Sequence, residues 1–297
     1  MRLASSTTIE VRRRWLSAFL FLLFLVWCPL SVARGQNVAI LTPDRSPQAE
    51  RVAEILAAEI SKKHDVQDRS MSEAAFRAVA PAATFNMTID QAKIVGSAMA
   101  CDHFILIRSE TLRRSSSAKA AYLESFASIY VVASKTGKLE DWRNLRAEGP
   151  SSSAALETLT DSVRLAASDI GSRIMPPRGE SSSDERPPME ELPIDNSPES
   201  KNFRAPVPFA RIKPAFTDLA FLYEITATVE LELDLDATGT ILRTSIVRWA
   251  GYGLDESVES AVRKMNWRPA ERNGKPIAMR VLLRYNFKKI DKQTAGL

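Results

Sequence analysis

The chain has 297 residues, which is enough for two domains of ordinary size. Its content of 45% hydrophobic and 26% charged residues is typical of globular proteins. The net charge of +4 is small for this length, and no dense stripe of lysine and arginine occurs, so nucleic acid is not an expected partner.

The first 35 residues carry an export signal. Three arginines at positions 12–14 precede residues 15–33, which are uncharged and rich in Leu and Phe, and small residues follow before Gln36. This order is typical of a signal peptide. The apolar stretch is also close to the roughly 20 residues that span a bilayer core. Residues 1–35 are therefore predicted to be either a cleaved signal peptide or a retained membrane anchor, and both alternatives export everything after Gln36.

Cysteine and histidine usage gives no sign of a metal or cofactor site. Cys28 lies inside the apolar segment, and Cys101 is then left alone as a small buried hydrophobic residue without a disulfide partner. His64 and His103 lie far apart and lack ligand-spaced partners. The sequence also lacks the Gly-x-Ser-x-Gly, His-Glu-x-x-His, P-loop and dinucleotide patterns. We therefore expect no catalytic residue, no metal and no cofactor.

Residues 36–175 are predicted to form an α/β domain. Apolar runs and alternating segments predict strands, whereas apolar spacings of three and four predict helices. Thr88 is a plausible N-cap, and the serines at 151–153 are placed to cap a last helix. In chain order, the pattern predicts a strand at 38–41, a helix from 47, a strand at 64–69, helices at 72–80 and 89–100, strands at 104–107, 122–132 and 139–142, and a helix after 153.

Residues 176–208 are predicted to be a linker. Prolines alternate there with Ser, Glu and Asp, and such a segment buries too little apolar surface to offset the entropy of ordering it.

Residues 209–290 are predicted to form a ββαβ unit. Residues 223–235 alternate between apolar and polar side chains, Asp236 to Gly239 supply a turn, and 241–249 form the return strand. A helix over 254–265 and a closing strand over 277–287 follow, separated by an Asn273-Gly274 turn. The chain as a whole is thus expected to be an α+β protein.

Residues 253–270 and the NGKP segment after them resemble the signature of the TonB C-terminal domain. Several of its motifs occur in the right order over about 85 residues. The positions that carry the signature are Leu254, Asp255, Ala261, Trp267, Pro269, Ala270, Asn273, Gly274 and Pro276. Most of them are interpreted as core and turn residues, and Asp255 as a charge at a helix N-terminus.

This resemblance implies a domain that binds outer-membrane receptors or other envelope proteins. In the family, a partner's peptide adds as an edge strand, so that unpaired backbone groups of the last strand supply the hydrogen bonds. By resemblance, the partner-binding residues are Leu283, Tyr285, Asn286 and Phe287.

The first half resembles the N-terminal domain of TolB and the CsgG-like α/β proteins of the bacterial envelope. The resemblance rests on residues 90–107, in which a helix ends in a small-residue turn before a central strand. It implies a partner-binding domain.

Together these features predict a non-enzymatic interaction protein of the periplasm that acts in transmembrane transport. The first alternative is a true energy transducer of the TonB type, anchored in the inner membrane by residues 15–33 and coupled to a motor complex. Against it, residues 15–33 contain no histidine, which the transducers carry in their membrane helix. The second alternative is a periplasmic hydrolase whose site would have to lie in the α/β domain, as a pocket with convergent ionisable groups.

Overall fold

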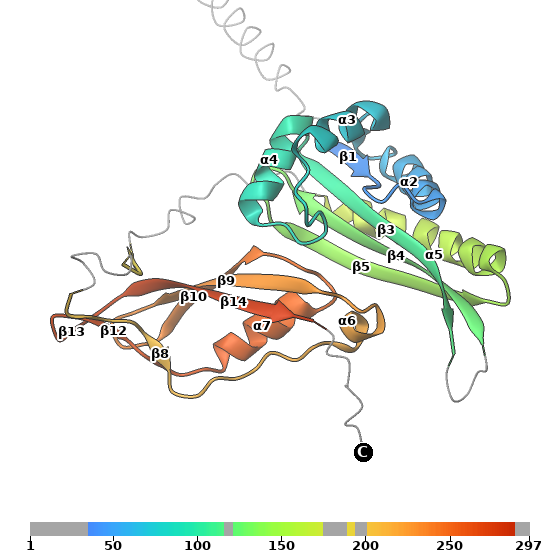
Figure 1. Cartoon of the computed structure of the whole chain (residues 1–297). Coiled ribbons are helices and arrows are strands. Elements are labelled where there is room, and N and C mark those ends of the chain that lie inside the picture. The colour runs from blue at the N-terminus through green and yellow to red at the C-terminus, as the bar shows by residue number, and fades with distance from the viewer. Residues whose placement is uncertain (1–34, 116–120, 175–188, 194–200, 289–297) are drawn as a thin grey trace, which may run out of the picture. The chain divides into compact units, whose positions relative to one another are not determined.

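The computed structural model of the chain describes residues 35–115, 121–174, 189–193 and 201–288 (Figure 1). From Gln36 on, the chain forms one compact unit. The predicted signal peptide or anchor at 1–34 lies outside the described residues. None of the helices in the described ranges has the length and apolar character needed to cross a membrane.

The first half of the chain folds around one five-stranded sheet with the order β2-β1-β3-β4-β5. Strands β2, β1 and β3 are parallel, and β3, β4 and β5 are antiparallel. We call this part, with its four helices, the α/β module. Its elements are β1 (Asn37–Leu41), α2 (Pro47–Ile60), β2 (Asp65–Val66), α3 (Arg69–Val79), α4 (Ile89–Met99), β3 (His103–Arg114), β4 (Tyr122–Ala133), β5 (Leu139–Gly149) and α5 (Ser152–Arg173).

Both faces of this sheet are buried, because successive strand residues point to opposite sides. On β3, Ile105 and Ile107 pack with α2 and α5 on one face. Phe104 and Leu106 lie in the second core, which α3 and α4 help to cover. Continuous apolar runs such as Phe104 to Ile107 are therefore the expected pattern for a central strand.

Side-chain caps fix the helix starts, and two of them confirm the sequence analysis. Thr88 and Gln91 form a reciprocal capping box at the start of α4. Ser151 accepts from the backbone N–H of Ala154 at α5. The predicted start of α3 at Ser72 was wrong, because Asp68 accepts from the N–H of Met71 at 3.0 Å and begins the helix at Arg69.

Two strands of the α/β module are longer than predicted. β3 continues to Arg114 and β5 continues to Gly149. The predicted third strand ended at Trp142 because charged residues follow it. β5 lies at the edge of the sheet, where charged side chains are tolerated and discourage pairing with other chains.

The C-terminal part confirms the ββαβ order, and we call it the ββαβ module (Figure 1). Its main sheet has the order β10-β9-β14-β6, and β9, β10 and β14 pair antiparallel. Helix α7 packs on one face, where Leu254, Val258 and Val262 share a core with Leu231 and Leu233. The elements are α6 (Asp218–Leu222), β9 (Ala227–Leu235), β10 (Ile241–Arg248), α7 (Leu254–Arg263), β11 (Trp267–Arg268), β12 (Ala270–Arg272), β13 (Lys275–Ile277) and β14 (Met279–Phe287).

The alternation over 223–235 misplaced the start of the first strand. β9 begins at Ala227, and Tyr223 instead ends the short helix α6, which the sequence analysis did not predict. Glu224 takes a left-handed φ of 52° between the helix and the strand. Tyr223 and Ile225 keep the apolar pattern because both are buried in the core, although they are not in the strand.

Three short strands lie within the predicted linker. These are β6 (Glu190–Glu191), β7 (Phe203–Arg204) and β8 (Val207–Pro208). β6 pairs with the start of β14, β7 with β12, and β8 with β11. The described parts of this segment are thus paired with the ββαβ module, and the domain boundaries at 175 and 208 stay a prediction.

The two modules share one apolar core. Tyr130 of β4 lies 5.8 Å from Trp249, and Trp142 of β5 lies 4.8 Å from Tyr252, measured between ring centroids. The Asn86 amide group donates to the carbonyls of Thr228 and Trp249 and accepts from the N–H of Thr228. The second face of the α/β sheet is therefore closed partly by the ββαβ module.

Candidate functional site

The outer side of β14 is an open strand edge. β14 pairs with β9 along its whole length, from Met279 opposite Leu235 to Phe287 opposite Ala227. On its other side, β6 pairs only with Met279 and Arg280. Among the described residues, no strand pairs with this side of β14 from Val281 to Phe287. Backbone N–H and C=O groups along this half are therefore available to an added strand.

The four predicted partner-binding residues all lie on this open half. Leu283 and Tyr285 are partly buried, and Phe287 is buried, on the face that carries α7. Asn286 is exposed on the opposite face, where its Oδ1 accepts from the Thr228 hydroxyl at 2.8 Å. The structure thus brings the four residues to one edge, and their role in partner binding stays a prediction.

A hollow of about 560 Å³ opens at the end of β14, and we call it the terminal pocket. Its walls come from the segment before α6, from α6 and from the last residues of β14. Among the described residues of the lining, apolar side chains dominate, two are lysines and none is a carboxylate. The lining residues are Lys213, Pro214, Ala215, Phe216, Phe221, Tyr285, Asn286, Phe287 and Lys288.

Hydrogen bonds to α7 and its preceding loop hold the pocket wall in place. The Ser257 hydroxyl of α7 donates to the carbonyl of Ala215 at 2.8 Å. Thr217 caps α6 by accepting from the N–H of Ala220, and its hydroxyl donates to the carbonyl of Tyr252 at 2.6 Å. These contacts fix the segment whose aromatic residue Phe216 stacks on Phe287 at 6.1 Å.

Burial raises the pKa of Tyr285, while the nearby positive charge of Arg211 acts in the opposite direction. The Tyr285 phenol is therefore a neutral group at physiological pH. Arg211 adds a third cation close to a pocket that already has Lys213 and Lys288 in its lining.

Glu230 and Asp234, on the face of β9 opposite α7, do not form a binding site of their own. The Arg280 guanidinium donates to Asp234 at 2.7 and 3.1 Å, and Arg284 donates to Glu230 at 2.8 Å. Glu230 and Asp234 are only 6% exposed beneath these arginines. These ion pairs between β9 and β14 neutralise the two carboxylates and leave the edge of β14 open.

The signature residues divide between core and turn. Leu254, Ala261, Trp267 and Ala270 are buried, and Pro269 is partly buried. Asn273, Gly274 and Pro276 are exposed around the β12–β13 hairpin, where Asn273 and Gly274 have φ of 51° and 75°, as a two-residue hairpin turn with two positive φ values requires.

Asp255 ties the end of β10 to the start of α7. Its carboxylate accepts from the N–H of Ala250 at 2.9 Å and of Gly251 at 2.8 Å. Burial raises the pKa of Asp255 to about 7, against the lowering effect of these two hydrogen bonds. The prediction of a simple helix-terminal charge missed that Asp255 is partly buried and bonded to the backbone of the preceding loop.

Asp255 also lines a second hollow, of about 440 Å³, together with several acidic side chains. This is the kind of pocket in which a hydrolase site would be sought. Most of its carboxylates, Glu256 excepted, have partners among the described residues: Glu140 binds His103, Asp141 binds Arg143, and Glu259 binds Thr244 and Arg263. With Asp255 bound to two backbone N–H groups, the geometry suits a structural network better than an acid–base pair.

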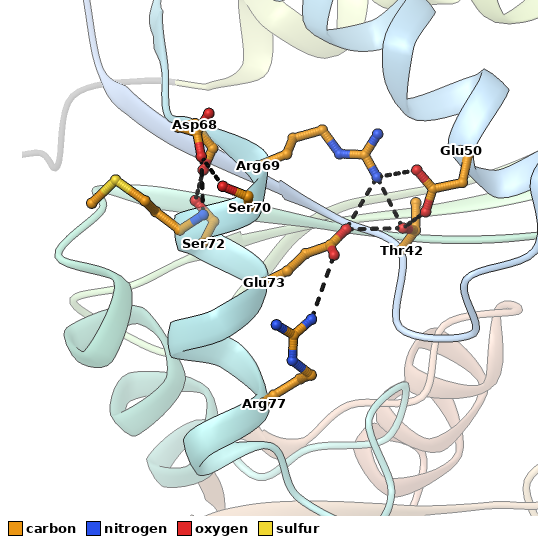
Figure 2. Close-up of polar contacts among 9 residues, drawn as sticks. Thr42, Glu50, Asp68, Arg69, Ser70, Ser72, Glu73 and Arg77 are labelled. Atoms are coloured by element: carbon orange, nitrogen blue, oxygen red, sulfur yellow. Dashed lines mark hydrogen bonds and ion pairs between the residues drawn. The ribbon is translucent and has the colours of Figure 1, made fainter.

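A third polar cluster lies at the carboxyl end of β1. Because β2 and β3 lie on opposite sides of β1, this end is a topological switch point, where open α/β sheets often bind ligands. Figure 2 shows Arg69 between Glu50 and Glu73, at 2.6 and 3.1 Å, with the Thr42 hydroxyl beside them. Arg77 reaches Glu73 at 3.7 Å.

The carboxylates of this cluster are also bonded within the cluster, although the buried Nε of Arg69 has no hydrogen-bond partner among the described residues. Burial opposes ionisation of Glu50, but hydrogen bonds from Thr42 and Arg69 outweigh it and lower the Glu50 pKa. A general acid or base needs a carboxyl group whose pKa is moved toward neutrality. The cluster therefore fits a role in joining α2 and α3 to the end of β1.

Comparisons with known proteins agree with the geometry of the second half. Residues 213–288 match the family described as Gram-negative bacterial TonB protein C-terminal. The solution structure of the Pseudomonas aeruginosa TonB C-terminal domain is similar at 19% identity and a TM-score of 0.27, and covers 35% of this chain and 98% of its own. Residues 213–288 thus form a TonB C-terminal domain.

Other similar structures include a PelC dodecamer and a lipoprotein. A PelC dodecamer from Paraburkholderia phytofirmans is 14% identical with a TM-score of 0.31, covering 46% of this chain and 89% of its own. A lipoprotein from Neisseria meningitidis is 14% identical with a TM-score of 0.33, covering 45% of this chain and 99% of its own. A search of curated proteins found no match. The resemblance of the first half to TolB and CsgG-like domains stays a prediction.

Sequence reasoning found the last strand but missed the terminal pocket. Phe216, Phe221 and Lys213 lie before the predicted strand, in a segment without periodic pattern. The available signal was two phenylalanines five positions apart, next to the start of a recognised domain. That spacing alone does not indicate that both reach the end of a strand some 70 positions later.

Proposed function

We propose that the chain is a non-enzymatic protein-interaction protein of the cell envelope. It binds an outer-membrane or other periplasmic protein through its TonB C-terminal domain, in support of transmembrane transport. The observation that carries this proposal is the open edge of β14 from Val281 to Phe287 within a domain of this family. An extended segment of the partner adds to that edge as a further strand.

Strand addition suits this edge for physical reasons. The paired side of β14 is held to β9 over nine residues without a register shift, so the acceptor strand is already formed. A preformed strand loses little conformational entropy on binding, and most of the ordering cost falls on the partner's segment. Main-chain hydrogen bonds then supply affinity, and side chains along the edge supply selectivity.

Photocrosslinking in envelope fractions tests the proposal. A photoreactive residue at Leu282 on β14 should give a discrete adduct with an envelope protein. The same residue at Leu242 on β10 is the matched control, because both leucines are exposed, at 49% and 59%, on outer strands of the sheet. Equal adducts at both positions, or an adduct at Leu242 alone, would contradict binding at β14.

A backbone substitution checks that the edge itself is used. Consecutive strand residues point their N–H groups to opposite sides. Of the residues Leu283 and Arg284, one therefore has its N–H on the open edge and the other donates to β9. Proline at the first removes one N–H from the open edge and keeps the bonds to β9, whereas proline at the second breaks a bond to β9. Of the two variants, the one that keeps the fold should lose the Leu282 adduct. Retention of the adduct in that variant would exclude strand addition as the binding mode.

A further inference from the structure

The terminal pocket lies where an added strand would pass. Tyr285, Asn286 and Phe287 line the pocket and also belong to the open half of β14. A strand added to this edge lies about 4.8 Å from β14, with side chains alternating between the two faces. Its residues opposite Tyr285 or Phe287 therefore point to the face on which the pocket opens.

An exposed aromatic side chain marks the pocket as a receiving surface. Phe221 of α6 is 56% exposed, although it contacts Phe216 edge-on at 6.4 Å between centroids. Phe216 in turn stacks on Phe287. The three rings form a continuous apolar wall that is already ordered, so a large apolar side chain entering it covers Phe221 without reorganising the pocket.

The charge around the pocket has one sign. Lys213 and Lys288 line it, Arg211 lies close enough to affect the Tyr285 pKa, and none of the described lining residues is a carboxylate. An acidic side chain on the incoming strand would meet these cations next to an apolar surface, where the attraction is stronger than in bulk water. A basic strand would be repelled.

We propose that the partner's segment is an extended strand with one large apolar anchor residue and an acidic residue one or two positions away. The anchor fills the terminal pocket against Phe221, and the carboxylate faces Lys213 and Lys288. This inference rests on the proposed strand addition at β14 and names the chemistry of the peptide that the site selects.

Peptide titration of the compact unit, residues 36–297, tests the inference. The probe is a capped eight-residue peptide of alternating valine and threonine that carries one phenylalanine and, two positions later, one glutamate. Phe221→Ala should weaken its binding by on the order of tenfold, because the anchor loses its aromatic contact. Phe209→Ala is the matched control: Phe209 is 76% exposed and does not line the pocket, so this variant should bind as the parent chain does.

Charge reversal tests the second half of the proposal. A peptide with lysine in place of the glutamate should bind more weakly to the parent chain, and the Lys288→Glu variant should reduce that preference, because Lys213 and Arg211 remain. Equal binding of both peptides by the parent chain would overturn the acidic preference. Equal binding by the parent chain and the Phe221→Ala variant would overturn the anchor.

Hydrogen exchange separates this inference from the proposed function. Bound peptide should slow amide exchange at Val281 to Phe287 on β14. Slowed exchange at these residues would support strand addition. If the peptide affinity then depends neither on Phe221→Ala nor on the peptide's charge, the proposed role of the terminal pocket is wrong. Absence of both protection and binding at millimolar peptide would count against both.

Discussion

The indole ring of Trp142 lies against Gly251 so closely that a β-carbon on Gly251 would be 2.7 Å from the Trp142 Cδ1. Trp142 belongs to β5 of the α/β module, and Gly251 precedes α7 in the ββαβ module. The contact is one of several across the shared core of Tyr130, Trp249 and Tyr252. The TonB C-terminal domain therefore packs against the rest of this chain through a specific, close-fitting surface.

Gly251→Ala should destabilise the chain by about 2–4 kcal/mol, from left-handed strain at φ 71° and overpacking against Trp142. Urea unfolding followed by tryptophan fluorescence measures the change. Gly274→Ala is the matched control, since Gly274 has φ 75° but nothing within 4 Å, and it should cost only about 1–2 kcal/mol of strain. Equal losses in the two variants would show that the close approach of Trp142 does not matter.

Asn86→Ala should lower the free energy of unfolding by about 1–3 kcal/mol, because it leaves two carbonyls and one N–H without a partner at the junction of the modules. Asn86→Asp should cost more, since a carboxylate cannot donate to the carbonyls of Thr228 and Trp249. Calorimetry of the two variants checks the order. An aspartate variant as stable as the parent chain would contradict this role of the amide.

Asp255 should make stability fall as the pH rises from about 4 to 7. Its folded pKa of about 7 lies above the unfolded value of about 3.9, so the folded state binds more protons in this window and loses stability toward its upper end. Asp255→Asn removes this titration, and the variant should gain up to roughly 4 kcal/mol relative to the parent chain between pH 4 and pH 8.

Urea unfolding at several pH values measures that difference. Glu157→Gln, at an exposed position of α5 far along the chain from Asp255, is the control and should follow the parent profile. Parallel profiles for Asp255→Asn and the parent chain would mean that Asp255 is ionised in the folded state throughout.

Arg114→Ala should destabilise the chain by about 2 kcal/mol, because Arg114 donates to the Leu222 carbonyl, stacks over Tyr223 at 5.3 Å and lies 3.5 Å from Glu124. Glu124 is only 3% exposed, and among the described residues the Tyr223 hydroxyl would be left as the donor to its side chain. Thermal unfolding measures the loss. Arg113→Ala, at the exposed neighbour, should change little, and an equal effect would refute the specific role of Arg114.

Much of the candidate site could be predicted because it lies on regular elements. The sequence analysis identified the closing strand over residues 277–287, and binding at its edge is what the resemblance to the family predicts. Phe221 could not be predicted, because α6 is a five-residue helix whose position depends on Thr217, Tyr252 and Arg114. A short helix has too little periodicity for sequence reasoning and is stabilised by its surroundings.

The sequence by itself determined the order of the main elements, the caps at Thr88 and Ser151 and the Asn273-Gly274 turn, because these depend on side-chain period and on hydrogen bonds within a few residues. Tertiary structure alone decided the shared core, the terminal pocket and the partly buried setting of Asp255. Asn86 and Thr228 are 142 positions apart, yet they exchange two hydrogen bonds. Such contacts depend on how two sheets pack, and no local pattern in the chain records that packing.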